Sequence, residues 1–274
     1  MDKLDLPYIK SEIKKRDPFS NKGDYGHALI IAGKKGSMGA AVIAAKACLR
    51  SGVGLLSVSV PGGERCILQT TVPEAMLVMR EESQLAMNTF SAIGMGPGMG
   101  IDPASEALLI QVLASCQIPL VLDADALTIL SKNIKLLEQV PAHTIITPHA
   151  GEFDRLFGYH TSNEERVQTA IQKANDYPIH IVLKGHHTAI VSAGEISYNT
   201  TGNAGLAKGG SGDALTGMIT AFLAQGYAVP IAAKLGVFIH GMAADITLQT
   251  QSVETMMITD VIDHMADAFK KITQ

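Results

Sequence analysis

Short apolar runs of strand length recur along this chain, and helical patterns separate most of them. The runs are continuously apolar, and many end in Gly, Pro, Asp or His. Continuous apolarity is typical of strands that are covered on both faces, as in a parallel sheet. The runs span residues 27–33, 55–60, 92–96, 119–123, 144–147 and 180–184, and an antiparallel edge hairpin is expected at 188–192 and 195–198. We therefore expect an α/β fold around a mostly parallel central sheet.

Helical patterns lie between the strands, and three of them close the chain. Asp102 precedes Pro103 as the expected cap of one helix. The expected helices span residues 39–50, 103–114 and 164–175, and then 213–225, 230–247 and 260–272 with no intervening strand pattern. This order predicts helices on both faces of the sheet and a helical C-terminal layer. No linker, repeat or low-complexity segment is visible, so we expect residues 1–274 to form a single domain.

Composition narrows the classes of function. Of the 274 residues 47% are hydrophobic, which excludes a disordered chain, and the net charge of -4 argues against a dedicated nucleic-acid binder. The first twenty residues lack the apolar core of a signal peptide, and no run approaches the roughly 18 apolar residues of a membrane span. We therefore expect a cytoplasmic protein that binds neither nucleic acid nor a membrane.

Cys48, Cys66 and Cys116 form no CxxC pair and are expected to be reduced.

A glycine-rich segment, residues 199–217, leads directly into a helical sequence. Gly209, Gly210 and Gly212 let the backbone approach an anion, and the N–H groups at a helix start are unpaired. Asp213 is the first acidic residue at this start. It is either a helix cap, worth roughly 1 kcal/mol, or a catalytic base beside an anion cradle. A base and a cradle suffice as the core of a phosphoryl-transfer site.

Two standard nucleotide signatures are missing. The sequence has no P-loop signature, and residues 94–100 do not fit the dinucleotide pattern GxGxxG. The candidate site residues instead follow the expected strands, at Gly33, residues 96–98, Asp123, His149 and Lys184. Ligands of open parallel sheets bind at the carboxyl ends of the strands, so these residues are expected to meet at one edge.

Several segments together resemble one family. Residues 22–26, 30–33, 39–41, 94–98, 121–127, 146–153, 182–185 and 199–217 are similar, in order, to the motifs of the ADP/ATP-dependent NAD(P)H-hydrate dehydratase family of the ribokinase-like superfamily. The ordered combination is far more specific than any one segment. The resemblance implies a ribokinase-like three-layer α/β/α fold.

One position separates this family from related kinases. Sugar and vitamin kinases of the superfamily often carry Asn-x-x-Glu, whereas this chain has His149-Ala150-Gly151-Glu152, as is usual in the dehydratase family. The resemblance implies that Glu152 approaches Mg²⁺ through water. The alternatives are a surface carboxylate at a helix start for Glu152, and a strand-end histidine bonded to backbone for His149.

The resemblance also implies roles for individual residues. Asp213 would be the base near the transferred phosphate. ADP or ATP would be bound by Lys184, Gly185, His186, His187, Thr188 and Gly212, and the hydrated nicotinamide nucleotide by Ala40, Gly98, His149, Asn203 and Asp213. His186 and His187 form no pattern with a third metal ligand, so we expect no zinc site.

The implied reaction is the ADP- or ATP-dependent dehydration of the S-epimer of NADH or NADPH hydrate, a lyase reaction that releases phosphate and AMP or ADP and uses Mg²⁺. One alternative is a ribokinase-like kinase of a small vitamin-precursor alcohol. A second is a non-catalytic nucleotide sensor, which the Gly-Ser-Gly-Asp at residues 210–213 disfavours. The resemblance further implies a homotetramer. Because the first glycine-rich strand begins near residue 27, we expect any epimerase partner to be a separate protein.

Overall fold

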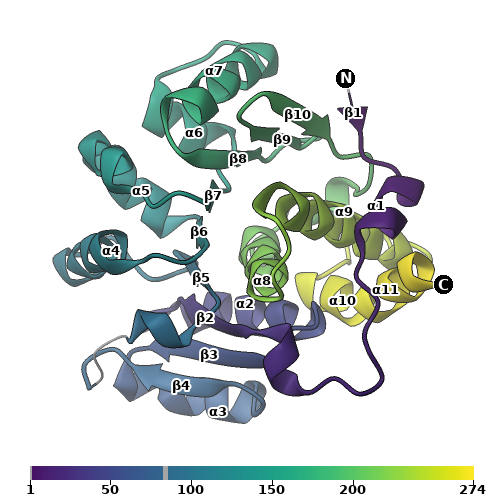
Figure 1. Ribbon diagram of the computed structural model, residues 1–274, viewed down its shortest axis with the longest axis horizontal. Helices are drawn as coiled ribbons and strands as arrows, with labels where there is room; N and C mark the ends of the chain where they lie inside the picture. Colours follow the sequence, from purple (N-terminus) through teal and green to yellow (C-terminus); the bar gives the residue numbers. More distant parts are fainter. Residues whose placement is uncertain (1, 83–85) are drawn as a thin grey trace.

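A computed structural model describes residues 2–82 and 86–274 of the chain. Within these residues ten strands form one sheet in the order β1-β10-β9-β8-β7-β6-β5-β2-β3-β4 (Figure 1). The strands are β1 (Asp2–Lys3), β2 (His27–Ile31), β3 (Leu55–Val60), β4 (Met76–Met79), β5 (Ala92–Met95), β6 (Leu120–Leu122), β7 (Thr144–Ile146), β8 (Ile179–Leu183), β9 (Ala189–Ser192) and β10 (Glu195–Tyr198). From β4 to β8 all neighbours are parallel, while β9 is antiparallel to β8 and β10. The expected parallel sheet with an edge hairpin is confirmed.

Helices cover both faces of this sheet, which gives three layers (Figure 1). One face carries α4 (Pro103–Ser115), α5 (Asp125–Lys132), α6 (Ala150–Phe157) and α7 (Asn163–Asp176). The other carries α1 (Leu6–Glu12), α2 (Met38–Arg50), α3 (Arg65–Thr71), α8 (Ser211–Ala224), α9 (Val229–Thr247), α10 (Ile258–Asp263) and α11 (Met265–Thr273). Leu29 and Ile31 of β2 enter one core and Ile30 enters the other, and all three are fully buried. This explains why the strands show no polar alternation.

Helix α8 lies in the middle of its layer and packs between α2 and α9. Residues 214–224 of α8 are all buried. A Cβ on Gly217 would lie 2.1 Å from the carbonyl oxygen of Ala44, so α8 and α2 cross with their backbones in close approach. Among the helices of the described residues, α9 is long and apolar enough to cross a membrane, but 78% of its most apolar window is buried. Such burial is typical of a core helix.

The structure differs from the expected elements in a few places. The helix expected at residues 260–272 is two helices, α10 and α11, which meet at His264. The His264 ring nitrogen Nδ1 lies 2.9 Å from the carbonyl oxygen of Asp260, so its side chain bonds to backbone at the junction. Helix α8 begins at Ser211, two residues earlier than expected. The edge strand β4 and the short helix α3 were not expected.

Candidate active site

The carboxyl ends of β6, β7 and β8 bring three predicted positions together. Asp123 directly follows β6, His149 follows β7, and Lys184 follows β8. Lys184 donates its backbone N–H to the carbonyl of Pro148 at 2.9 Å, and an isolated parallel bridge links His149 and Lys184 beyond the ends of β7 and β8. The Nζ atom of Lys184 then lies 2.8 Å from Oδ1 of Asp123, across the end of β7. The expected meeting of strand ends is confirmed for these residues.

Asp123 and Lys184 form an ion pair in which the carboxylate is buried and the lysine is partly buried. Asp123 is 1% exposed, and its Oδ2 accepts a hydrogen bond from Thr216 Oγ1 of α8 at 2.9 Å. Burial opposes ionisation of Asp123, but the Lys184 ammonium and the hydrogen bonds from Lys184 and Thr216 outweigh it and lower the pKa. Burial likewise opposes the charge of Lys184, and the carboxylates of Asp123 and Glu152 outweigh it and raise that pKa. Both groups are therefore charged at neutral pH.

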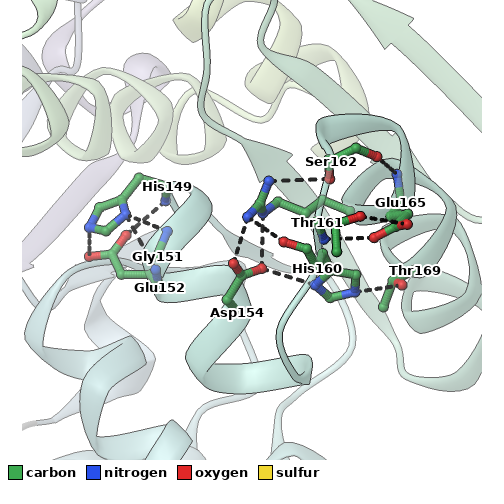
Figure 2. Close-up of polar contacts among 10 residues, drawn as sticks. His149, Gly151, Glu152, Asp154, His160, Thr161, Ser162, Glu165 and Thr169 are labelled. Atoms are coloured by element: carbon green, nitrogen blue, oxygen red, sulfur yellow. Dashed lines mark hydrogen bonds and ion pairs between the residues drawn. The ribbon is translucent and has the colours of Figure 1, made fainter.

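His149 and Glu152 cap the start of α6 reciprocally (Figure 2). His149 Nδ1 accepts from the backbone N–H groups of Gly151 and Glu152 at 3.0 and 3.3 Å, and Glu152 Oε2 accepts from the His149 N–H at 2.8 Å. Glu152 is 7% exposed and lies 3.7 Å from Lys184 Nζ, so it is not the surface carboxylate of the alternative interpretation. His149 does bond to backbone through Nδ1, yet its side chain remains half-exposed at the site.

A second cluster of polar side chains lies farther along α6, around Asp154 (Figure 2). Asp154 accepts two hydrogen bonds from Arg166 of α7, at 2.9 and 2.6 Å, and its Oδ1 lies 2.9 Å from His160 Nδ1. His160 Nε2 lies 2.8 Å from Thr169 Oγ1, also on α7. These contacts join the middle of α6, at Asp154, to α7.

Asp213 is the third residue of α8 and does not cap it. The N-cap is Gly210, which has no side chain, so the interpretation of Asp213 as the cap is wrong. Burial is the largest cause of a raised pKa at Asp213, the carboxylates of Asp123 and Asp125 add to it, and Lys184 opposes it, with a resulting pKa of about 6. A partly buried carboxylate with this pKa suits a general base that works near neutral pH.

Geometry requires a glycine at residue 210 and leaves little room for a side chain at residue 212. Gly210 has φ +94°, and a Cβ there would lie 2.7 Å from Ile43 and 2.8 Å from Ile258. A Cβ on Gly212 would lie 3.2 Å from both Asp123 Oδ2 and Lys184 Nζ. The start of α8, with its unpaired N–H groups, therefore lies directly against the buried ion pair.

A cavity of about 730 Å³ opens beside this helix start. Its wall contains predicted nucleotide and substrate residues from four different segments, namely His149, Lys184, Gly185, His186, Thr188, Asn203 and Gly212. His187 packs against His186, with ring centroids 4.4 Å apart, but is outside the wall. A volume of this size is within the range of small-molecule and cofactor sites.

Ala40 and Gly98 meet each other outside the cavity wall. Gly98 has φ +58°, and a Cβ there would lie 2.9 Å from the Ala40 Cβ, so the turn after β5 packs against the start of α2. The same turn is linked to the catalytic region, because the N–H of Gly100 donates to Asp125 Oδ2 at 2.8 Å. Asp125 in turn is one of the carboxylates that raise the pKa of Asp213.

The loop of residues 199–206 is tied to α9. Asn203 Nδ2 donates to Asp245 Oδ1 at 3.0 Å, and its Oδ1 accepts from the N–H of Gly205 at 2.9 Å. The amide of Asn203 therefore bonds to α9 and to its own loop, while the residue still lines the cavity. Sequence reasoning did not predict Asp245, His240 or the role of Asp123. Only Asp123 had a usable signal, an acidic residue directly after a buried strand.

A larger hollow lies at the opposite edge of the sheet. It has a volume of about 990 Å³ and is lined by residues that precede β2 and β3, such as Tyr25 and Gly52, and by the segment 13–17. Two of its cations are engaged by backbone, because Arg16 donates to the Gly52 carbonyl and Lys14 Nζ donates to the Gly226 carbonyl at 2.8 Å. The amino ends of parallel strands are also not where ligands of such folds bind. The smaller cavity, whose wall includes Gly212 but not Asp213, is therefore the candidate active site.

Known proteins share this fold and these segments. The chain is 34% identical to the ADP-dependent (S)-NAD(P)H-hydrate dehydratase of Listeria monocytogenes, over 98% of this chain and 97% of that one. It is 32% identical to the bifunctional NAD(P)H-hydrate repair enzyme of Moorella thermoacetica over 99% of its own length, and spans about half (54%) of that relative. The crystal structure of the ADP/ATP-dependent NAD(P)H-hydrate dehydratase of Bacillus subtilis, co-crystallized with ATP/Mg²⁺, matches with a TM-score of 0.89 at 30% identity, covering 99% and 98% of the two chains.

The three-layer arrangement is the ribokinase-like α/β/α fold expected from the sequence. The family model described as NAD(P)H-hydrate dehydratase matches residues 28–267, which include every candidate site residue discussed above. This chain therefore belongs to the NAD(P)H-hydrate dehydratase family.

Proposed function

We propose that this protein restores NADH or NADPH from the S-epimer of the hydrate, with ADP or ATP as phosphoryl donor and with release of phosphate and AMP or ADP. The observation that carries the proposal is the Asp213 carboxylate, with a pKa of about 6, beside the start of α8 at the end of the parallel strands. Family membership supplies the substrate class.

The nucleotide would occupy the cavity of about 730 Å³. Its phosphates would lie at the N–H groups around Gly212, near the Lys184 ammonium. Gly185, His186 and Thr188 line the same cavity, whereas His187 would contribute by packing against His186. The hydrated nicotinamide nucleotide would approach from the side of Ala40, Gly98 and His149, with Asn203 holding the loop that closes the cavity.

Asp213 would accept the proton of the added hydroxyl as the hydroxyl oxygen attacks the terminal phosphorus. The bond from that phosphorus to the bridging oxygen of ADP breaks, and AMP leaves. Phosphate then departs from the ring carbon with its C–O bond electrons, and loss of a proton from the neighbouring carbon restores the double bond. Phosphate is a far better leaving group than hydroxide. Backbone N–H groups stabilise the charge on the transferring group.

The donor atoms at the site fit Mg²⁺ that arrives with the nucleotide. Mg²⁺ in such sites is held by one or two carboxylates together with substrate phosphates and water. Glu152 would contact it through water, because its Oε2 already accepts from the backbone of His149. When bound, the ion would neutralise negative charge on the phosphates.

One assay tests the proposal. The protein is incubated with hydrated NADH, ADP and Mg²⁺, and absorbance at the reduced-nicotinamide band and free phosphate are followed together. We expect one free phosphate to be released for each NADH that is restored. A stable phosphorylated product without recovered absorbance would instead indicate a kinase, and nucleotide binding without turnover would indicate a sensor. We also propose that the protein is cytoplasmic and forms a homotetramer. The mass measured by light scattering on a gel-filtration column would test the tetramer.

A further inference from the structure

His240 of α9 belongs to the wall of the cavity and is not explained by the proposed chemistry. It is 6% exposed, and its Nε2 has no hydrogen-bond partner among the described residues. Buried polar side chains in folded proteins are nearly always paired with protein, water or ligand. The unpaired nitrogen in the cavity wall therefore points to a partner that the chain itself does not supply.

The polar groups of the neighbouring loop are already committed elsewhere. Thr201 Oγ1 donates to the carbonyl of Phe238 at 2.8 Å, and Asn199 Nδ2 donates to the carbonyl of Thr201 at 2.8 Å. The loop lies directly on α9 at Gly241, where a Cβ would be 2.4 Å from Thr201 Oγ1. This close packing fixes the loop, so its groups are not free to turn toward His240.

His240 is uncharged at neutral pH. Burial, with a smaller contribution from the Lys184 ammonium, lowers the pKa of His240 to about 4. A neutral imidazole offers one donor and one acceptor, which suits a hydroxyl or the edge of a heterocycle better than a phosphate. The apolar side chains of Leu206, Leu215 and Val237 line the same cavity and provide surface for a flat ring.

We propose that His240 forms a hydrogen bond with the nucleoside part of the adenine nucleotide and thereby determines specificity for that nucleoside. The inference rests on the proposed function in so far as this cavity holds that nucleotide. The phosphates lie toward Gly212 and Lys184, and the nucleoside lies between the apolar side chains, where the imidazole meets a base nitrogen or a ribose hydroxyl.

Isothermal titration with ADP and Mg²⁺ tests this contact directly. We expect His240→Leu to raise the Kd about tenfold, which corresponds to about 1.4 kcal/mol. His240→Gln keeps a donor and an acceptor and is expected to lie between His240→Leu and the unmodified protein. His180→Leu is the matched control, because His180 is a half-buried histidine of β8 that contacts Ser192 outside the cavity, and its Kd should not change.

Nucleotide analogues locate the contact on the nucleoside. Inosine diphosphate alters the base edge, and 2′-deoxy-ADP removes a ribose hydroxyl. The analogue that lacks the contacted group should bind the unmodified protein more weakly than ADP, and this difference should vanish in His240→Leu. Loss of the difference for either analogue supports the proposal and identifies the contacted atom.

A folded His240→Leu protein with a Kd for ADP within twofold of the unmodified protein would overturn the inference. If that variant does not fold, the same criterion applies to His240→Phe, which keeps an aromatic ring but has no hydrogen-bonding nitrogen. The measurement needs no hydrated NADH, so its outcome is separate from the proposed reaction. Lack of turnover by the unmodified protein would contradict the dehydratase proposal, whereas unchanged binding in the His240 variants would contradict this inference alone.

Discussion

Thr216 Oγ1 lies 2.9 Å from Asp123 Oδ2, and this hydrogen bond joins α8 to the end of β6 one turn after Asp213. Thr216 is fully buried and Asp123 is 1% exposed, so the contact is shielded from water. It holds the first turns of α8 against the sheet edge. The position of Asp213 therefore depends on a buried network that includes Asp123 and Lys184 as well as on its own helix.

Removal of the Lys184 charge should destabilise the fold. In Lys184→Met the Asp123 carboxylate stays buried without its cation, which we expect to lower the free energy of unfolding by about 3–5 kcal/mol at pH 7. The double variant Asp123→Asn with Lys184→Met should recover part of this loss. Lys173→Met, which removes a more exposed pair with Asp176, is the control and should cost less than about 1 kcal/mol. Urea unfolding measures all four proteins, and equal losses for the two lysine variants would refute the role of the buried pair.

The pH dependence of kcat/KM should follow the ionisation of Asp213. Because the pKa of Asp213 is about 6, we expect kcat/KM for hydrated NADH to fall as the pH drops through 6, where the base becomes protonated. Asp213→Asn should lose about 10²–10⁴-fold in kcat at all pH values, while its Kd for ADP changes little. Turnover close to normal in that variant would remove Asp213 from the mechanism.

The same substitution should stabilise the protein above pH 6. The pKa of Asp213 is raised from 3.8 to about 6, so the folded state binds more protons than the unfolded state between these values. Stability of the unmodified protein should thus fall as the pH rises through this window. Relative to it, Asp213→Asn should gain up to about 3 kcal/mol at pH 7 and almost nothing below pH 4. Urea unfolding at the two pH values measures the gain, and a gain that does not depend on pH would contradict the assignment.

An added methyl group at residue 212 should disturb the site without unfolding the protein. In Gly212→Ala the Cβ lies 3.2 Å from Asp123 Oδ2 and Lys184 Nζ, so the ion pair or the helix start must shift by a few tenths of an ångström. We expect turnover to fall about tenfold to a hundredfold. Gly209→Ala is the matched comparison, because a Cβ there has no neighbour within 4 Å. Equal effects of the two substitutions on kcat would argue against the contact with the ion pair.

The sequence predicted the sheet well and the site only partly, for a physical reason. Buried parallel strands such as β6 are visible as apolar runs, and Asp123 was recognisable because it ends one. Its pairing with Lys184, 61 residues later, depends on which strands are neighbours, and local patterns do not contain that information. His240 is a single histidine in an apolar helix, so nothing local distinguishes it from a core residue. Strand β4 is short and at the sheet edge, where the pattern of full burial is lost.

The close crossing of α2 and α8 has a consequence for how this protein tolerates change. At Gly217 the carbonyl of Ala44 occupies the space that a side chain would need, so main-chain atoms alone define the spacing of the two helices. Exchanges among the apolar residues around them do not remove this contact between main chains. Substitutions in this layer should therefore lower the thermal stability before they move Asp213 relative to the carboxyl ends of the strands. The residues of this interior can then vary while the reaction is retained.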